Sequence, residues 1–358
     1  YGRMPNATFL ALVEPDLDNF RTALEWSLGR RHDVALGAEL AGATGWIYRQ
    51  TALYAEGVRW AERAIAEARD VPPLVAGRLH MAVSFLYFNM GAIRGALDAA
   101  VQATEAYRDI AALSRLCWAL TQQAYCLYLL GDANAARDTA AEAVEVGRRQ
   151  DDGFRLAGAL NALAITIPIE CAAERFAPLE EAIRYYRAAG DEGAIVPTAN
   201  LAETHFAVGN FTAALSAGLE VVALTRKNRD RSNLAAALTN VAAYALTIDD
   251  VAQADDAARE ALGLVRDLGK TRSTMCALQH MGAIAARHGD HVRAARLEGA
   301  SNELYREFGL AREFTERSLY DRTIKDIRAA IEEYELQQHL AAGAALSLDD
   351  AVTEALAD

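Results

Sequence analysis

The chain has 358 residues, of which 52% are hydrophobic and 24% are charged, and its formal net charge is −13. This composition is typical of a soluble globular protein with a large core. A surface this acidic repels a phosphate backbone, so we expect no direct binding to nucleic acid. No apolar run approaches the ~20 residues that span a bilayer, and no secretory signal is visible, so we expect a cytoplasmic protein.

The first predicted helix is amphipathic and runs from Glu14 to Leu28, after a connecting segment over residues 1–13. Pro15 lies in its first turn, where the missing backbone N–H would have no partner in any case. Spaced apolar residues predict one buried face. The candidates for burial are Leu17, Phe20, Leu24, Trp26 and Leu28.

From residue 40 to residue 300 the sequence repeats with a period near 40. A turn residue recurs every 38 to 40 residues, at Ala52, Gly91, Gly131, Cys171, Gly209, Asp249 and Gly289. Seven residues before each turn, and five after most of them, the side chain is small, as two closely packed helices require. One such helix hairpin leaves an apolar face uncovered, so we expect several hairpins to stack in series.

The hairpins predict helices in a regular order, with Gly or Asp at most joints. The predicted ranges are 33–48, 54–68, 72–89, 93–108, 111–130, 133–149, 154–167, 174–189, 193–208, 211–227, 231–248, 251–268, 271–288 and 291–308. In the fourth unit Pro168 and Cys171 stand where the turn should be. Because proline lacks an N–H and stops the incoming helix, we expect a distorted hairpin there.

After residue 309 the period is lost. A longer, more charged helix is predicted over Thr315–Tyr334, and the next residues extend it or start another. Gly343 is predicted to break the helical pattern. A last short helix, Leu348–Leu356, follows Ser347, which is its expected N-cap. We expect this segment to close the open end of the stack.

The hairpin pattern resembles the tetratricopeptide repeat (TPR). Its large–small pair, later aromatic, turn glycine and following alanine appear in Val83-Ser84…Tyr87…Gly91…Ala96 and, with His205 in place of the aromatic, in Leu201-Ala202…His205…Gly209…Ala214. The TPR period is about 34 residues, so this is similar to a variant with longer helices. The resemblance implies an all-α, right-handed superhelical solenoid over residues 36–310, preceded by a linker and first helix (1–35) and followed by capping helices (311–358).

A second resemblance lies at the two ends of the chain. Four segments are similar to the C-terminal helical-repeat region of bacterial STAND-type ATPases and LuxR-like transcriptional regulators: Glu14–Leu28, Tyr54–Ala64, Gly299–Gly309 and Gly343–Ala351. A Pro-rich step expected after Gly309 is absent, and Ala311–Thr315 stands there instead. The resemblance implies a sensor arm of a signalling protein that binds an inducer or partner and controls an ATPase. Because the chain begins with Tyr1 rather than Met, we expect it to be a piece of a longer protein, and the resemblance implies that the ATPase domain lies upstream.

The concave surface that a TPR stack implies carries two sets of candidate residues. The early units place aromatic side chains on it, either as a groove for a ligand or partner helix or as ordinary core: Trp46, Phe85, Phe88, Trp118, Tyr125 and Tyr128. The later units place a row of amide or imidazole groups on it, which could bond the main chain of an extended peptide or satisfy structural hydrogen bonds: Gln122, Asn200, Asn240 and His280, with Glu203 beside them. The neighbouring inward positions of the later units lack Lys and Arg, which disfavours a clamp for a free C-terminus.

Other motifs give no support for a cofactor, a metal or catalysis. Gly263–Thr271 resembles a phosphate-binding loop but has five residues between its glycines and no preceding strand. Arg287–His291 has metal-ligand residue types but spans a helix turn without further ligands nearby. We therefore expect a non-catalytic interaction domain with no cofactor and no metal. The alternatives are a free-standing peptide-binding scaffold or adaptor and an enzyme with its site in the concave pocket.

Overall fold

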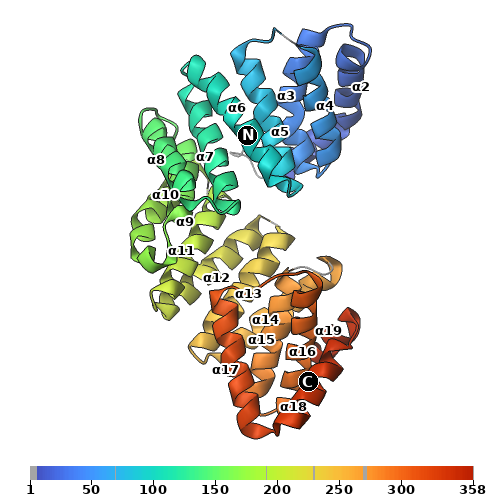
Figure 1. The fold of residues 1–358 in the computed structure, drawn as a ribbon, viewed down its shortest axis with the longest axis vertical. Coiled ribbons are helices and arrows are strands. Elements are labelled where there is room, and N and C mark those ends of the chain that lie inside the picture. The colour runs from blue at the N-terminus through green and yellow to red at the C-terminus, as the bar shows by residue number, and fades with distance from the viewer. Residues whose placement is uncertain (1–5, 69, 191, 229, 269–271, 358) are drawn as a thin grey trace. The chain divides into compact units, whose positions relative to one another are not determined.

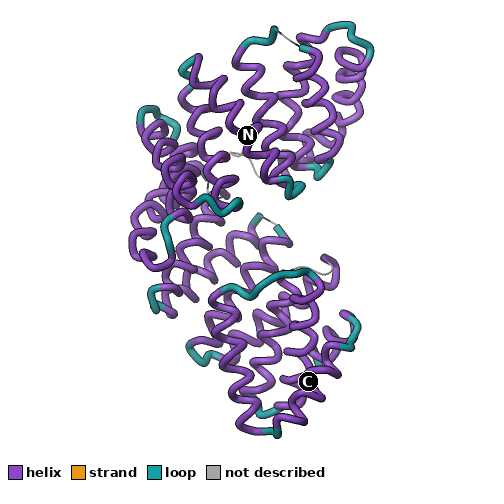
Figure 2. Tube along the Cα trace, viewed as in Figure 1, coloured by secondary structure: helices purple, strands orange, loops and turns teal. Residues whose placement is uncertain are grey.

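The computed structural model describes residues 6–68, 70–190, 192–228, 230–268 and 272–357, and every regular element in these ranges is helical (Figure 2). The predicted all-α class is therefore confirmed. The helices are α1 Asn6–Val13, α2 Leu17–Leu24, α3 Val34–Gln50, α4 Tyr54–Glu67, α5 Pro73–Asn89, α6 Ile93–Asp109, α7 Leu113–Leu129, α8 Ala133–Arg148, α9 Gly153–Thr166, α10 Phe176–Ala189, α11 Ile195–Ala207, α12 Phe211–Lys227, α13 Arg231–Thr247, α14 Val251–Leu268, α15 Arg272–Arg287, α16 His291–Glu307, α17 Phe314–Ala330, α18 Glu333–Ala344 and α19 Leu348–Leu356. Among the described residues, no helix has the length and apolar character needed to cross a membrane.

The turn residues of the repeat adopt the left-handed backbone conformation that reverses the chain between two helices. Their φ angles lie between 58° and 84° at Ala52, Gly91, Gly131, Gly209, Asp249 and Gly289. Glycine adopts this conformation without a steric penalty, which explains why it fills most of these positions.

Small residues occupy the places where paired helices touch, as the repeat predicted. The alanines five residues after the turn are fully buried: Ala96, Ala136, Ala214, Ala254 and Ala294. At Gly45 an added Cβ would lie 2.3 Å from the Cβ of Ala82. A larger residue at position 45 would therefore prevent the close approach of α3 to α5.

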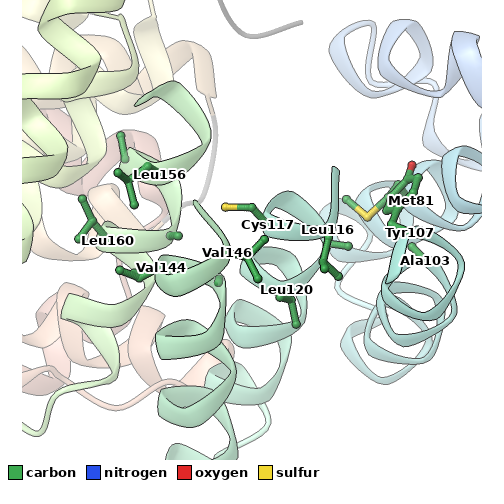
Figure 3. Close-up of a cluster of buried hydrophobic side chains, with 14 of the residues drawn as sticks. Met81, Ala103, Tyr107, Leu116, Cys117, Leu120, Val144, Val146, Leu156 and Leu160 are labelled. Carbon is green, nitrogen blue, oxygen red and sulfur yellow. The ribbon is translucent and has the colours of Figure 1, made fainter. Parts of the chain in front are cut away.

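The chain forms two compact units, Tyr1–Asn200 and Leu201–Asp358. In the first unit the hairpins α3/α4, α5/α6, α7/α8 and α9/α10 follow one another, and the first helix of each hairpin contacts the first helix of the next (Figure 1). Leu116, Leu120, Leu156 and Leu160 contribute to the largest apolar cluster described in this unit, which joins α7 to α8 and α9 (Figure 3).

The N-terminal segment differs from its prediction in two ways. Residues 6–13, expected to be a connector, form α1. The helix predicted over Glu14–Leu28 is divided into a 3₁₀ turn, α2 and a π-helical turn at Glu25–Gly29. Leu24 and Leu28 are fully buried as predicted, but Trp26 is 47% exposed. Trp26 lies two residues from Leu24 and therefore points to the opposite side of the helix, where it stacks on His32.

The fourth hairpin is distorted as predicted. Helix α9 ends at Thr166, Pro168 is extended with φ −57° and ψ 151°, and a 3₁₀ segment, Ile169–Arg175, leads into α10. Cys171, at the expected turn position, has φ −107° and makes no left-handed turn. The reversal between α9 and α10 therefore needs a longer connection than the other hairpins.

In the second unit α13/α14 and α15/α16 form hairpins, and α17, α18 and α19 pack against α15 and α16. The helix predicted over Thr315–Tyr334 ends earlier, at Ala330, because Ile331 is extended, and Tyr334 belongs to α18. Gly343 is the next-to-last residue of α18, so the helix ends one residue after the predicted break, and Gly343 is buried against α16. The N-cap at Ser347 is confirmed, since its side chain accepts a hydrogen bond from the N–H of Asp350.

Candidate ligand-binding site

Three of the predicted aromatic residues lie together in the first unit. Trp46, Phe85 and Trp118 come from α3, α5 and α7, the first helices of three successive hairpins. The ring centroids of Phe85 and Trp118 are 4.7 Å apart, and those of Trp46 and Trp118 are 6.3 Å apart. A repeat of near 40 residues places them on neighbouring helices at equivalent faces, so the stack itself builds the cluster.

A cavity of about 630 Å³ opens beside this aromatic cluster. The four first helices of the unit contribute to its wall, with α9 supplying Phe154 and Arg155. This volume is in the range of pockets that hold a drug-sized ligand or a short peptide segment. The aromatic side chains are half-buried, so their rings are shared between the protein interior and the cavity.

Four arginines line the same cavity: Arg49, Arg78, Arg115 and Arg155. The guanidinium carbon of Arg155 lies 3.9 Å from the ring centroid of Trp118, and that of Arg49 lies 4.6 Å from that of Trp46. These cation–π contacts hold two positive charges over the rings of the aromatic wall. Burial lowers the pKa of Arg49 and of Arg155 below its usual value, since both guanidinium groups have lost solvent.

Asp152 is the one acidic side chain among the described residues that line the cavity. It caps α9, accepting a hydrogen bond from the N–H of Arg155 at 3.3 Å. Its other oxygen accepts a hydrogen bond from the hydroxyl of Ser114 at 2.7 Å. Asp152 therefore stabilises the start of α9 and ties it to α7.

A chain of polar groups continues along the first helices beyond the aromatic cluster. Asn161 donates to the hydroxyl oxygen of Tyr125 at 2.7 Å, and Asn200 donates to the side-chain oxygen of Asn161 at 2.8 Å. Burial raises the pKa of Tyr125, which keeps the hydroxyl protonated. Tyr125 and Gln122 also line a smaller cavity of about 140 Å³, together with Trp118 and Phe85.

The remaining aromatic candidates lie elsewhere on these helices. Phe88 is half-buried and Tyr128 is 42% exposed, and neither borders the two cavities described above. Gln122 is 5% exposed, and its amide lies 3.8 Å from the sulfur of Cys126. The six predicted aromatics therefore divide into a cavity wall and separate positions rather than forming one continuous surface.

The later candidates Glu203, Asn240 and His280 belong to the second unit. Glu203 is exposed and Asn240 is half-buried. His280 is fully buried, and its Nε2 lies 2.9 Å from a carboxylate oxygen of Glu316 in α17. The interpretation of His280 as a groove residue was wrong, because α17 covers it and it forms part of the packed interior.

Sequence reasoning missed the four arginines and Asn161. The signal was present at helical spacing: Arg49 follows Trp46 by three residues and Arg115 precedes Trp118 by three, so each shares a face with a predicted aromatic. Asn161 lies next to Ala162, which stands 40 residues after Gln122 and so holds the equivalent position of the fourth unit. When the alignment of the distorted fourth repeat is shifted by one residue, Asn161 takes the position that Gln122 and Asn200 hold in their repeats.

The motifs considered for a cofactor or metal add no site. Gly269, Lys270 and Thr271 of the loop resembling a phosphate site lie outside the described residues. Asp290 caps α16 by accepting from the N–H of Arg293 at 3.0 Å. No three His, Cys, Asp or Glu side chains in the described part of the chain are grouped as metal ligands.

Comparison with known proteins shows a shared fold at low identity. The family model for anaphase-promoting complex subunit 5 matches residues 87–166 and 195–244, which is less than half of the chain. No curated protein sequence matches.

Several solved structures are similar over nearly the whole chain. The apo form of the quorum sensor NprR from B. thuringiensis has a TM-score of 0.56 at 11% identity and covers 98% of this chain and 100% of its own. A Rap protein in complex with Competence and Sporulation Factor has a TM-score of 0.53 at 10% identity, covering 93% and 99%. The apo form of RapI has a TM-score of 0.54 at 13% identity, covering 84% and 99%. These likenesses show that the chain has a TPR-like helical-repeat fold.

Proposed function

We propose that this chain is the non-catalytic sensor domain of a bacterial regulator and that it binds a peptide in the cavity of the first unit. The observation that carries the proposal is the cavity of about 630 Å³ walled by Trp46, Phe85 and Trp118. Partly buried aromatic rings beside an open cavity supply apolar contact area with little loss of side-chain entropy. Farther along the same helices, Asn161 and Asn200 bond to each other and to Tyr125, and these hydrogen bonds tie the first helices together beside the wall.

The similar structures support a signal-binding role. One of them is a quorum sensor and another was solved with Competence and Sporulation Factor bound. The resemblance of the chain ends to STAND-type and LuxR-like regulators supports the further proposal that an ATPase domain precedes this region and responds to the bound signal. A binding role also fits the cavity wall, where Ser114 and Asp152 are bonded to each other and no histidine or cysteine is among the described lining residues.

The experiment is a selection of peptides from a random display library on the immobilised chain, followed by calorimetric titration of the recovered peptides. Trp46→Ala removes a wall of the cavity, and Trp26→Ala removes an exposed tryptophan outside it. We expect Trp46→Ala to weaken binding by about tenfold or more, because truncation of an aromatic anchor costs about 1–2 kcal/mol or more. Trp26→Ala should bind as the wild type does.

Far-UV circular dichroism of both variants shows whether the helices remain. Peptides that bind Trp46→Ala and the wild type equally would place their site outside the cavity and contradict the proposal. Recovery of no peptide that binds the wild type would do the same.

A further inference from the structure

The charge of the cavity is opposite to that of the chain. The chain carries a net charge of −13, whereas the described lining residues include Arg49, Arg78, Arg115 and Arg155 against the single acid Asp152. Long-range attraction to the whole molecule would favour a cationic ligand. A local group of like charges in a hollow therefore calls for a specific explanation, since it lowers the stability of the empty protein.

Among the described lining residues the single acid, Asp152, acts on Arg155 and raises its pKa, although burial lowers that pKa by more. None of the ion pairs described for this chain involves Arg49, Arg78, Arg115 or Arg155. The Nε of Arg49 is buried without a hydrogen-bond partner in the described residues. Arg115 lies close enough to Arg155 to lower its pKa, as two neighbouring positive charges do.

The arginines beside the aromatic rings supply the donors that a carboxylate needs. The guanidinium carbons of Arg49 and Arg155 lie over the rings of Trp46 and Trp118, and a guanidinium group carries its N–H donors around its edge. Two N–H donors on one edge match the two oxygens of a carboxylate. The ring beneath remains available at its rim to an apolar side chain of the same ligand.

We infer that the cavity of the first unit selects a peptide segment in which a large apolar side chain lies beside acidic side chains. The apolar side chain contacts Trp46, Phe85 and Trp118, and the carboxylates bond to the four arginines. This inference rests on the proposed peptide-binding function and names the class of peptide that the site takes.

The test uses two capped peptides that differ only in charge: acetyl-Gly-Glu-Phe-Glu-Gly-amide and acetyl-Gly-Gln-Phe-Gln-Gly-amide. Both lack charged ends and tryptophan, so the fluorescence of Trp46 and Trp118 reports their binding. We expect the acidic peptide to bind about tenfold or more tightly than its amide analogue, with a preference that weakens as salt is added. Equal binding of the two peptides would overturn the inference and leave the proposed function intact.

Variants of the lining arginines test whether these side chains cause the preference for the acidic peptide. Arg78→Gln with Arg115→Gln removes two charges that make no cation–π contact, and we expect it to abolish the preference for the acidic peptide. Arg78→Lys with Arg115→Lys keeps both charges and should retain most of the preference. Arg94→Gln, at an exposed arginine outside the cavity, is the matched control and should behave as the wild type.

The outcomes distinguish failure of the inferred preference for acidic peptides from failure of the proposed peptide-binding function. A preference that persists in the double glutamine variant would overturn the assignment to these arginines. Tight binding of indole-3-acetate, with no binding of either capped peptide, would assign the site to a small aromatic acid and overturn the peptide class. If neither the capped peptides nor the library-derived peptides bind the wild type, the proposed function itself fails.

Discussion

Glu298 is a fully buried carboxyl group in α16 whose two oxygens have no hydrogen-bond partner among the described residues. It stands four residues after Ala294, at a position that is Ala100, Ala140, Gly218 or Ala258 in the other repeats that have an alanine five residues after the turn. Gly282 in α15 makes room for it, since a Cβ there would lie 3.3 Å from the Cγ of Glu298. Burial raises the pKa of Glu298 well above its usual value, and the nearby Glu316 adds to this while Arg312 opposes it.

This raised pKa predicts a pH-dependent stability. The unfolded chain releases the Glu298 proton near pH ~4.3, whereas the folded protein keeps it to higher pH. The folded state therefore binds more protons in this window, and the free energy of unfolding falls as pH rises, by on the order of 1 kcal/mol per pH unit at most. The glutamine of Glu298→Gln does not titrate, so the variant lacks this decrease with pH. The free energy of unfolding of the variant minus that of the wild type should therefore rise between pH 5 and pH 8.

Urea unfolding followed by circular dichroism across this pH range makes the measurement, with Glu335→Gln at an exposed site as the control. Wild-type and Glu298→Gln stability curves that run parallel with pH would show that Glu298 does not titrate as described.

At the residue scale the sequence predicted the aromatic cluster but not its charged surroundings. Trp46 and Phe85 were recognisable because they are large aromatic side chains at equivalent repeat positions in an alanine-rich background, and Trp118 because it lies two helical turns before the equivalent position of the third unit. The role of Arg49 and Arg155 depends on a stacking contact with a ring, and that contact exists only once the helices are packed. His280 was misplaced for a related reason, since its partner Glu316 is 36 residues away and outside the repeat.

At the scale of the elements, the crossing of α16 and α18 depends on two glycines. A Cβ at Gly343 would lie 1.8 Å from the backbone oxygen of Arg296, and one at Gly299 would lie 2.1 Å from that of Leu340. Because backbone atoms cannot move aside as a flexible side chain can, both positions need hydrogen in place of a methyl group.

Gly343→Ala should therefore destabilise the second unit by about 1–3 kcal/mol through overpacking of this crossing. Gly263→Ala is the matched control, because Gly263 lies in α14 with open space around its Cβ position. The same substitution there should stabilise the protein by about 0.5–1 kcal/mol through helix propensity. The difference is measured by thermal unfolding, and two alanine variants that shift the midpoint equally would contradict the close crossing.

The helices of the repeat were predictable to within about two residues because each turn is encoded locally. Gly91, Gly131, Gly209 and Gly289 mark the reversals through their left-handed conformation, and a following Asp caps several of the next helices. The chain ends were harder to predict because they lie outside the period. The π-helical turn at Glu25–Gly29 and the break at Ile331 carry no proline or glycine signal at their start.

At the scale of the whole molecule, the two units carry different kinds of polar interior. The first unit has an arginine-lined cavity, whereas polar groups in the second are bonded to one another across helices. Gln279 donates to the backbone and side-chain oxygens of Glu316 at 2.8 and 3.0 Å, and Arg312 bonds both Gln279 and Asn302. These bonds join α15 and α16 to α17, whereas the buried oxygens of Glu298 in the same unit have no partner among the described residues.

The central claim is that the first helices of the stacked hairpins in the first unit form the binding site. Hydrogen–deuterium exchange of the whole chain, with and without a peptide recovered by the display selection, tests it directly. We predict that bound peptide slows exchange at the cavity-lining stretches of α3, α5, α7 and the start of α9, with little direct effect on α15 and α16. Protection confined to the second helices of the hairpins, or to the second unit, would contradict the account.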